Sequence, residues 1–232
     1  MRKAVVDYSD FKLSRINEPR FAHLWLLGGW IAYFVLYYLT EHFIPTARCH
    51  VIHCALDDVI PFQEGFLIFY CYWFFLVAGS LIWCLRHDIL AFKRLQIYIM
   101  ITQLLAMIVY IVYPSVQHLR PASFERDNLL TRLMAFIYAV DTPTGVCPSL
   151  HVAYSVAIAS VFCHKRDASP MVKCVMVFSA VMISLSTAFV KQHSVVDIVM
   201  AMPVCALAEW LVFGNTPLRR WIEKQTYSKR QK

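Results

Sequence analysis

Residues 66–85 read FLIFYCYWFFLVAGSLIWCL and contain no charged side chain. A helix that crosses the roughly 30 Å hydrocarbon core of a bilayer needs about 20 predominantly apolar residues, at about 1.5 Å for each residue. This stretch has that length and that composition. It therefore predicts a membrane-spanning helix.

Five further stretches have the same apolar character. Together the six lie at residues 22–43, 66–85, 95–113, 150–163, 171–190 and 195–213. The fourth is short, and it reaches a full span only if it extends back through the turn at Pro148 and Ser149. The first is too long for a cleaved signal peptide, and its tryptophans suit a membrane anchor. We therefore predict an all-α polytopic membrane bundle of six transmembrane helices.

The composition supports one membrane domain. Of the 232 residues, 59% are apolar and only 16% are charged, whereas soluble domains carry about 25% charged residues. No repeat or linker divides the chain, so we predict a membrane domain over residues 21–214 between tails at 1–20 and 215–232. The net charge of +7 does not indicate nucleic-acid binding, because the basic residues gather at the ends of the apolar segments.

The basic residues also predict an orientation. Seventeen of the 22 lysines and arginines lie in the two tails and in the second and fourth connections. The other five, Arg48, Arg120, Arg126, Arg132 and Lys191, lie in the first, third and fifth connections. Positive residues are retained on the cytoplasmic side. Both termini are therefore predicted to be cytoplasmic, and the odd-numbered connections extracytoplasmic.

Three polar clusters fall on the predicted extracytoplasmic side. They are HLRP at 118–121, CPSLH at 147–151 and KQHSVVD at 191–197. Polar groups at membrane depth cost free energy and are functional candidates by default. One such cluster is more simply an interfacial anchor or a helix cap. Three clusters at the ends of three helices favour a functional site.

The residue types in these clusters suit phosphoryl transfer. His193 and Asp197 are four residues apart and would share a face of a helix. A carboxylate that accepts one imidazole proton orients the ring and makes the other nitrogen more basic, although an interfacial ion pair has the same spacing. Ser149 is a helix cap or a phosphate ligand. Arg120 offers a planar cation that matches phosphate oxygens.

The order of these residues resembles the three signature blocks of the type 2 phosphatidic acid phosphatase superfamily. The blocks are Arg120-Pro121, then Pro148-Ser149-Leu150-His151, then Ser186 with His193 and Asp197. The resemblance implies the six-helix fold and a metal-independent reaction without a cofactor. It implies that His193 attacks phosphorus, that Asp197 orients His193 and that His151 protonates the leaving group. It also implies that Arg120, Ser149 and Ser186, the first residue of the third block, belong to the phosphate site.

The chain departs from the superfamily pattern at three positions. Tyr113 stands where the first block usually has lysine, Thr187 where the third usually has arginine, and Leu150 where the second usually has glycine. Two phosphate-binding cations are therefore missing, and we expect Lys191 to replace one of them. These departures make the chain more similar to the inositol phosphorylceramide synthase branch, so the acceptor stays open.

Two other polar segments are set aside. The sequence CHVIHC at residues 49–54 lacks the separated ligand pairs of a zinc site, although a Cys49–Cys54 disulfide stays open. Asp57 and Asp58 are interpreted as a solvated or interfacial turn rather than as head-group ligands. Residues 128–140 predict a short amphipathic helix on the membrane surface.

The sequence thus predicts an integral membrane lipid phosphate phosphatase that forms a phosphohistidine. Its partners would be a lipid phosphate and the bilayer, with no nucleic acid. The alternative is a phosphotransferase that passes the phosphoryl head group to a lipid or polyol. A small transporter is the alternative from another class, but transporters of this kind show Gly- or Pro-broken helices in repeated halves, and the chain has only six glycines and no repeat.

Overall fold

The computed structural model describes residues 6–227, and these residues are mostly helical. Five segments are long and apolar enough to cross a membrane. They are Ala22–Phe43, formed by η2 (Ala22–Leu27) and α1 (Gly28–Phe43); Glu64–His87, formed by η4 (Glu64–Phe66) and α3 (Leu67–His87); α4 (Ile89–Val112); α7 (Pro170–Phe189); and α8 (Val195–Phe213). The prediction of a helical protein with long apolar helices is confirmed. The number of helices that meet the length criterion is five rather than six.

The fourth predicted helix, which does not meet the length criterion, is α6 (Leu150–His164) with only 15 residues. At about 1.5 Å for each residue it is roughly 22 Å long, shorter than the hydrocarbon core. It is also the most enclosed helix, because it packs against α3, α4, α7 and α8. Ten of its residues are buried. Protein rather than lipid therefore surrounds α6, which explains why its sequence is apolar without the length of a full span.

Side-chain caps fix where the helices begin. The Asp88 carboxylate accepts a hydrogen bond from the Ala91 amide, so α4 starts at Ile89, six residues before the predicted boundary. Ser169 caps α7, which has Pro170 in its first turn, and Ser194 caps α8. These residue types satisfy amides that have no partner within the helix.

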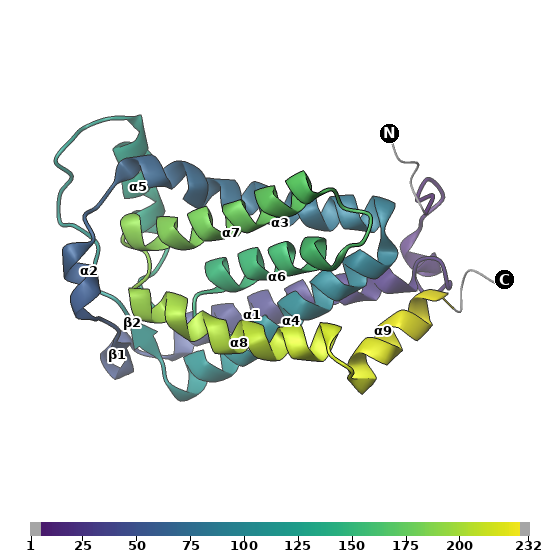
Figure 1. The fold of residues 1–232 in the computed structure, drawn as a ribbon. Helices are drawn as coiled ribbons and strands as arrows, with labels where there is room; N and C mark the ends of the chain where they lie inside the picture. Colours follow the sequence, from purple (N-terminus) through teal and green to yellow (C-terminus); the bar gives the residue numbers. More distant parts are fainter. Residues whose placement is uncertain (1–5, 228–232) are drawn as a thin grey trace.

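The shorter elements lie at the two ends of the bundle (Figure 1). They are η1 (Leu13–Arg15), η3 (Thr46–Arg48), β1 (His50–Val51), α2 (Ala55–Val59), β2 (Ser115–Val116), α5 (Leu129–Val140) and α9 (Pro217–Tyr227). α2, α5 and both strands lie at one end, whereas η1 and α9 lie at the other (Figure 1). The predicted amphipathic helix is confirmed as α5, with Asn128 as its cap.

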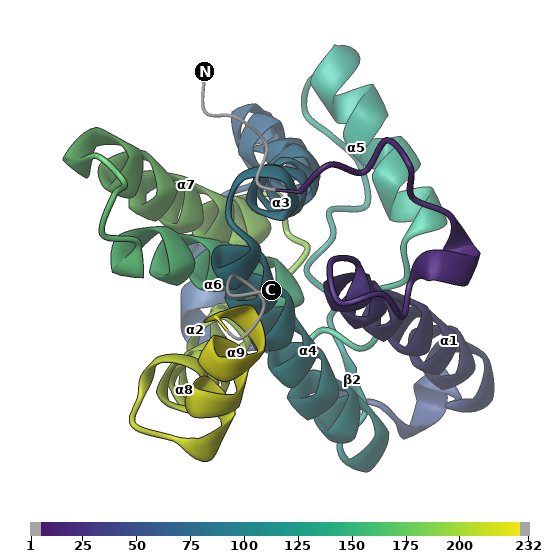
Figure 2. The ribbon, with the colours of Figure 1, turned by 90° about the vertical axis from the view of Figure 1, so that its right-hand side faces the viewer.

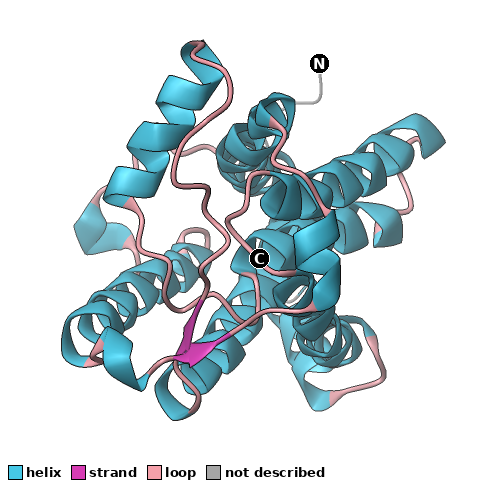
Figure 3. Cartoon of the chain, turned by 90° about the vertical axis from the view of Figure 1, so that its left-hand side faces the viewer, coloured by secondary structure: helices cyan, strands magenta, loops and turns pink. Residues whose placement is uncertain are grey.

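α4 is the central helix of the bundle and contacts α1, α3, α6 and α8 (Figure 2). α1 lies at the edge, packs mainly against α4, and has no buried residue. The parallel pair β1–β2 joins the segment after α1 to the segment after α4, with His50 opposite Ser115 (Figure 3). This pairing draws the loops at that end of the bundle together.

Candidate functional site

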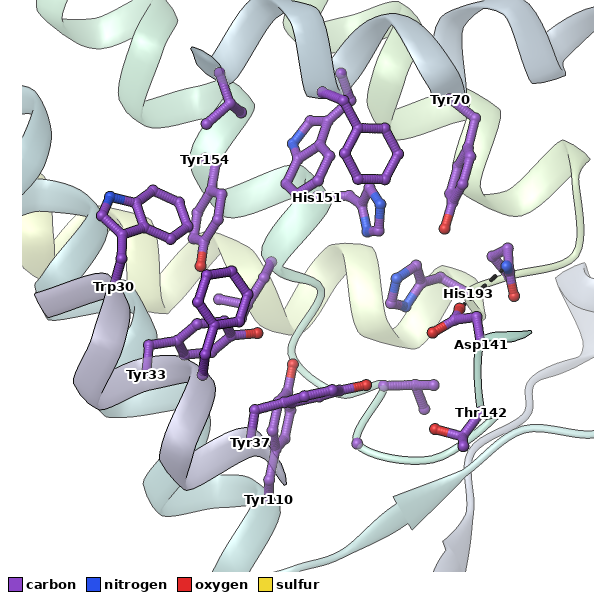
Figure 4. A pocket seen from close by; sticks show the side chains of 18 of the residues that line it. Trp30, Tyr33, Tyr37, Tyr70, Tyr110, Asp141, Thr142, His151, Tyr154 and His193 are labelled. Atoms are coloured by element: carbon purple, nitrogen blue, oxygen red, sulfur yellow. Dashed lines mark hydrogen bonds between the residues drawn. The ribbon is translucent and has the colours of Figure 1, made fainter. Parts of the chain in front are cut away.

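The candidate site lies at the end of the bundle that carries α2 and α5. His193 precedes α8, His151 lies in the first turn of α6, and both side chains project into one cavity (Figure 4). The centroids of the two imidazole rings are 5.5 Å apart. Two of the three polar clusters therefore meet at this cavity.

His193 is bound to Asp197, as the spacing predicts, but the two do not share a face of a helix. His193 lies one residue before Ser194, the N-cap of α8, and Asp197 is the third residue of the helix. Asp197 Oδ2 accepts from His193 Nδ1 at 3.1 Å and from the Ser194 amide at 3.0 Å. The contact is therefore part of a helix cap. It leaves the other ring nitrogen of His193 available for chemistry.

His151 has a different environment, without a carboxylate. Its ring lies against the rings of Tyr70 and Trp73, with centroids 4.7 and 4.2 Å away (Figure 4). Its Nε2 has no hydrogen-bond partner within residues 6–227. The ring is therefore held by aromatic packing, and its Nε2 is buried without being satisfied by any described residue.

Arg120 lies beside the cavity but does not line it. Its guanidinium donates to the carbonyl oxygens of Tyr138 and Asp141, at 3.0 and 2.8 Å, and to Gln192 Oε1 at 2.8 Å. The Asp141 carboxylate is 3.6 Å from the guanidinium. Arg120 thus ties the end of α5 to the loop that carries His193, and Gln192 and Asp141 separate it from the cavity.

The other three expected phosphate ligands do not line the cavity either. Ser149 is completely buried and caps α6, and its amide donates to the Asp197 carbonyl at 3.1 Å. Ser186 is also completely buried, and its hydroxyl donates to the Ile183 carbonyl within α7. Lys191 Nζ donates to the carbonyl of Asp57 at 2.7 Å. Ser149 and Lys191 therefore act as structural supports of the site.

The cavity itself has a volume of about 410 Å³ and lies between α1 and α3. These two helices make almost no direct contact with each other. Aromatic rings from α1, α3, α4 and α6 form most of the wall: Trp30, Tyr33, Phe34, Tyr37, Tyr70, Trp73, Phe74, Tyr110 and Tyr154. The other ionisable side chains among the described residues of the wall are His151, His193 and Asp141. The cavity therefore suits a largely apolar ligand with a polar end beside His193.

Asp141 is a site residue that the sequence did not single out. It ends α5, lines the cavity beside His193, and accepts from Gln192 Nε2 at 3.2 Å (Figure 4). Burial raises the pKa of Asp141 above its ordinary value, against the opposing effects of Arg120 and His193. The sequence feature that could have drawn attention to Asp141 was its position directly after an amphipathic helix. That signal does not reveal a contact with residue 192.

Asp57 is a second residue that the sequence misjudged. The interpretation as a solvated turn is wrong for Asp57, which is 3% exposed, although its neighbour Asp58 is exposed. Burial opposes ionisation of Asp57, but hydrogen bonds from the Ser194 hydroxyl and the Val195 amide, with others from Cys54, outweigh it and lower its pKa. Cys54, like Cys49, is a free thiol.

Comparison of the chain with protein-family models, with curated proteins and with solved structures found no match in any of the three.

Proposed function

We propose that this protein is a membrane enzyme that hydrolyses a phosphate ester or pyrophosphate of a lipid through a phosphohistidine at His193. The observation that carries the proposal is the His193–Asp197 pair at the polar end of an apolar cavity that it shares with His151. Asp197 holds Nδ1, so the other nitrogen of His193 is the nucleophile. The resemblance of the three sequence blocks to the type 2 phosphatidic acid phosphatase superfamily supports the same roles.

In this reaction the free nitrogen of His193 forms a bond to phosphorus, and the bond from phosphorus to the leaving oxygen breaks. His151 gives its proton to that oxygen, because its Nε2 has no competing partner among the described residues. In the second step His151 takes a proton from water, and the oxygen of that water displaces His193 from phosphorus. Arg120 supplies positive charge beside the cavity through its contacts with Gln192 and Asp141.

The lipid reaches the site sideways, between α1 and α3. The aromatic wall accommodates the hydrocarbon part of the substrate, while the phosphate lies at the end that carries His193. A substrate held in this way need not leave the bilayer. The shared apolar character of the lipid and the wall supplies most of the binding free energy.

We also propose that α6 is the sixth crossing. Because α3, α4, α7 and α8 surround it, α6 need not match the hydrocarbon thickness, and the loop before Leu150 completes the path. Six crossings put both tails on one side of the membrane. The distribution of basic residues makes that side cytoplasmic.

A second candidate is a phosphotransferase with a lipid or polyol acceptor. It is favoured by one observation, the absence of lysine and arginine from the described wall of the cavity. A site with so little positive charge suits a phosphodiester head group better than a doubly charged phosphate ester. The two candidates share the first half of the reaction and differ only in the acceptor.

The test is an assay of the purified protein against lipid phosphates, lipid pyrophosphates and phosphodiester lipids. Phosphorus-labelled enzyme is then transferred to water alone or to water with a lipid alcohol or polyol. We expect release of inorganic phosphate in water, at the steady-state rate and in the presence of a chelator. Release that requires the alcohol, with the label in that molecule, would replace the phosphatase with the phosphotransferase. A substrate that is turned over equally well by His193→Ala would remove both.

A further inference from the structure

Asp57 joins two distant parts of the chain at the start of α8. Its carboxylate accepts from the Ser194 hydroxyl at 2.6 Å, from the Val195 amide at 2.8 Å and from the Cys54 amide at 2.8 Å. Its backbone carbonyl accepts from Lys191 Nζ. Asp57 therefore holds the chain on both sides of His193.

Two carboxylates, those of Asp197 and Asp57, hold the start of α8. The first amides of a helix have no acceptor within it. Asp197 Oδ2 accepts from the Ser194 amide and from His193, while Asp57 accepts from the Val195 amide and the Ser194 hydroxyl. Asp197 Oδ1 is buried and has no hydrogen-bond partner among the described residues, so the orientation of this carboxylate rests on the two bonds to Oδ2. Asp57 holds Ser194, whose amide makes one of these two bonds.

We propose that Asp57 is a positioning residue for His193: by holding Ser194 and Val195 in place at the start of α8, it keeps the Asp197 carboxylate directed at the imidazole. The role of His193 itself rests on the proposed function. Asp57 does not line the cavity, so its side chain acts only through the cap of α8 that holds Asp197 against the imidazole. The bond from Lys191, which has a φ of 53°, is made to the backbone carbonyl of Asp57, so variants of the Asp57 side chain retain it.

The principal variant is Asp57→Asn, which keeps one acceptor oxygen but presents an amide to donors. Loss of a partner that orients a reactive histidine typically costs roughly 10- to 100-fold, so we expect kcat to fall by that factor with KM unchanged. Asp58→Asn is the matched control, because Asp58 is exposed and bonds only to His53 among the described residues. It should retain the wild-type kcat.

A double-variant cycle separates positioning from general structural support. If Asp57 acts through Asp197, then Asp57→Asn should reduce kcat less than about threefold in a protein that already carries Asp197→Asn. The same loss in both backgrounds would show that Asp57 acts independently of the pair, and it would overturn the proposal.

A second variant tests the contact without altering a charge. Val195→Pro removes the amide that donates to Asp57, and proline is well tolerated at the first position of a helix. The preceding Ser194 already has φ −70° and ψ 155°, as a residue before proline requires. We expect this variant to melt within a few degrees of the wild type and to lose roughly two- to tenfold in kcat. It therefore decides the question if Asp57→Asn does not fold.

The reactivity of His193 provides a readout that does not require turnover. Diethylpyrocarbonate acylates neutral imidazole, and mass spectrometry of the His193 peptide gives the rate for that residue. We expect Asp57→Asn and Val195→Pro each to slow acylation of His193 severalfold, but not in the Asp197→Asn background. Unchanged rates in both variants would overturn the positioning role. Failure of the proposed function appears separately, as lipid phosphate turnover that is absent from the wild type or survives His193→Ala.

Discussion

At the scale of single residues, the two histidines of the cavity have environments that suit different tasks. His193 donates to a carboxylate, which stabilises the charge that the ring gains when it attacks phosphorus. His151 lies against Tyr70 and Trp73 and has no carboxylate partner among the described residues. These differences assign nucleophilic attack to His193 and proton transfer to His151.

The first prediction concerns this pair. His193→Ala should reduce turnover to the uncatalysed background, and Asp197→Asn should reduce kcat by roughly 10²- to 10⁴-fold, because asparagine keeps a hydrogen bond but not the charge. Steady-state kinetics on purified protein measures both. His118→Ala is the control, since His118 is exposed and lies outside the cavity wall. Wild-type kinetics in Asp197→Asn would show that the carboxylate has no role in the reaction.

The second prediction concerns Asp141, the carboxylate that faces the expected phosphate position. Asp141→Asn should tighten inhibition by inorganic phosphate roughly three- to tenfold at pH 7, because it removes a negative charge beside the anion. Burial raises the pKa of Asp141, so the wild-type carboxylate becomes neutral as the pH falls through that raised value. The difference between the inhibition constants of the wild type and Asp141→Asn should therefore shrink as the pH falls.

Inhibition constants measured from pH 7 downward test this prediction. The groups that act on Asp141 are Arg120, His193, Glu41 and Gln192, and all four are retained in the variant. Exposed Glu125 provides the control Glu125→Gln, which should behave as the wild type throughout. Weaker inhibition in Asp141→Asn would show that Asp141 supports anion binding, for instance by holding Arg120.

At the scale of helices, the arrangement of α1 decides what reaches the site. α1 packs mainly on α4 and hardly touches α3, so a cavity remains between α1 and α3. The aromatic residues that α1 directs into this space include Tyr33 and Tyr37 (Figure 4). Because both helices are apolar and exposed along this side, we expect the opening to face lipid.

The third prediction tests this route with two adjacent residues of α3. Ala78 lines the cavity, whereas Gly79 faces a separate groove on the α7 side of the helix. Ala78→Phe should raise KM for a long-chain lipid phosphate roughly tenfold, equivalent to about 1.4 kcal/mol of binding free energy. Turnover of a short-chain analogue should change little, because that molecule does not reach residue 78. Gly79→Phe adds the same ring to the other side and should leave both substrates unaffected.

At the scale of the whole molecule, the polar chemistry and the basic segments lie at opposite ends. His193 and His151 lie at the end with α2 and α5, while α9, with Arg219 and Arg220, lies at the other (Figure 1). This separation agrees with an extracytoplasmic site and cytoplasmic tails. It also defines which positions can report on the orientation.

The fourth prediction uses cysteines at exposed positions of the two ends. Cys147 is unsuitable as a reporter, because it is buried and burial raises the pKa of its thiol to about 12. Ser123→Cys and Arg166→Cys, each in a cysteine-free protein, place the thiol at exposed sites at opposite ends. A membrane-impermeant thiol reagent on intact cells should label position 123 and spare position 166. Labelling of position 166 alone would show that the orientation is opposite to the one proposed.

The sequence alone determined the features that depend on local physics. Membrane helices follow from the length and composition of single segments. The bounds of α8 and of the segment Ala22–Phe43 were therefore predicted to the residue, and those of α7 to within one residue. The contact between His193 and Asp197 was also predicted, although the cap of α8 makes it rather than one face of a helix. The sequence marked α6 as short, but it did not show why, because apolar composition is the same whether lipid or protein surrounds a helix.

Only the tertiary structure decided which polar groups meet. Asp57 contacts Ser194 across 137 positions of the chain, and Arg120 contacts Gln192 across 72. Such contacts depend on how the helices pack and on the β1–β2 pairing at their ends, which no local pattern encodes. The cavity has the same origin, since it exists because α1 packs on α4 and leaves the space beside α3 open.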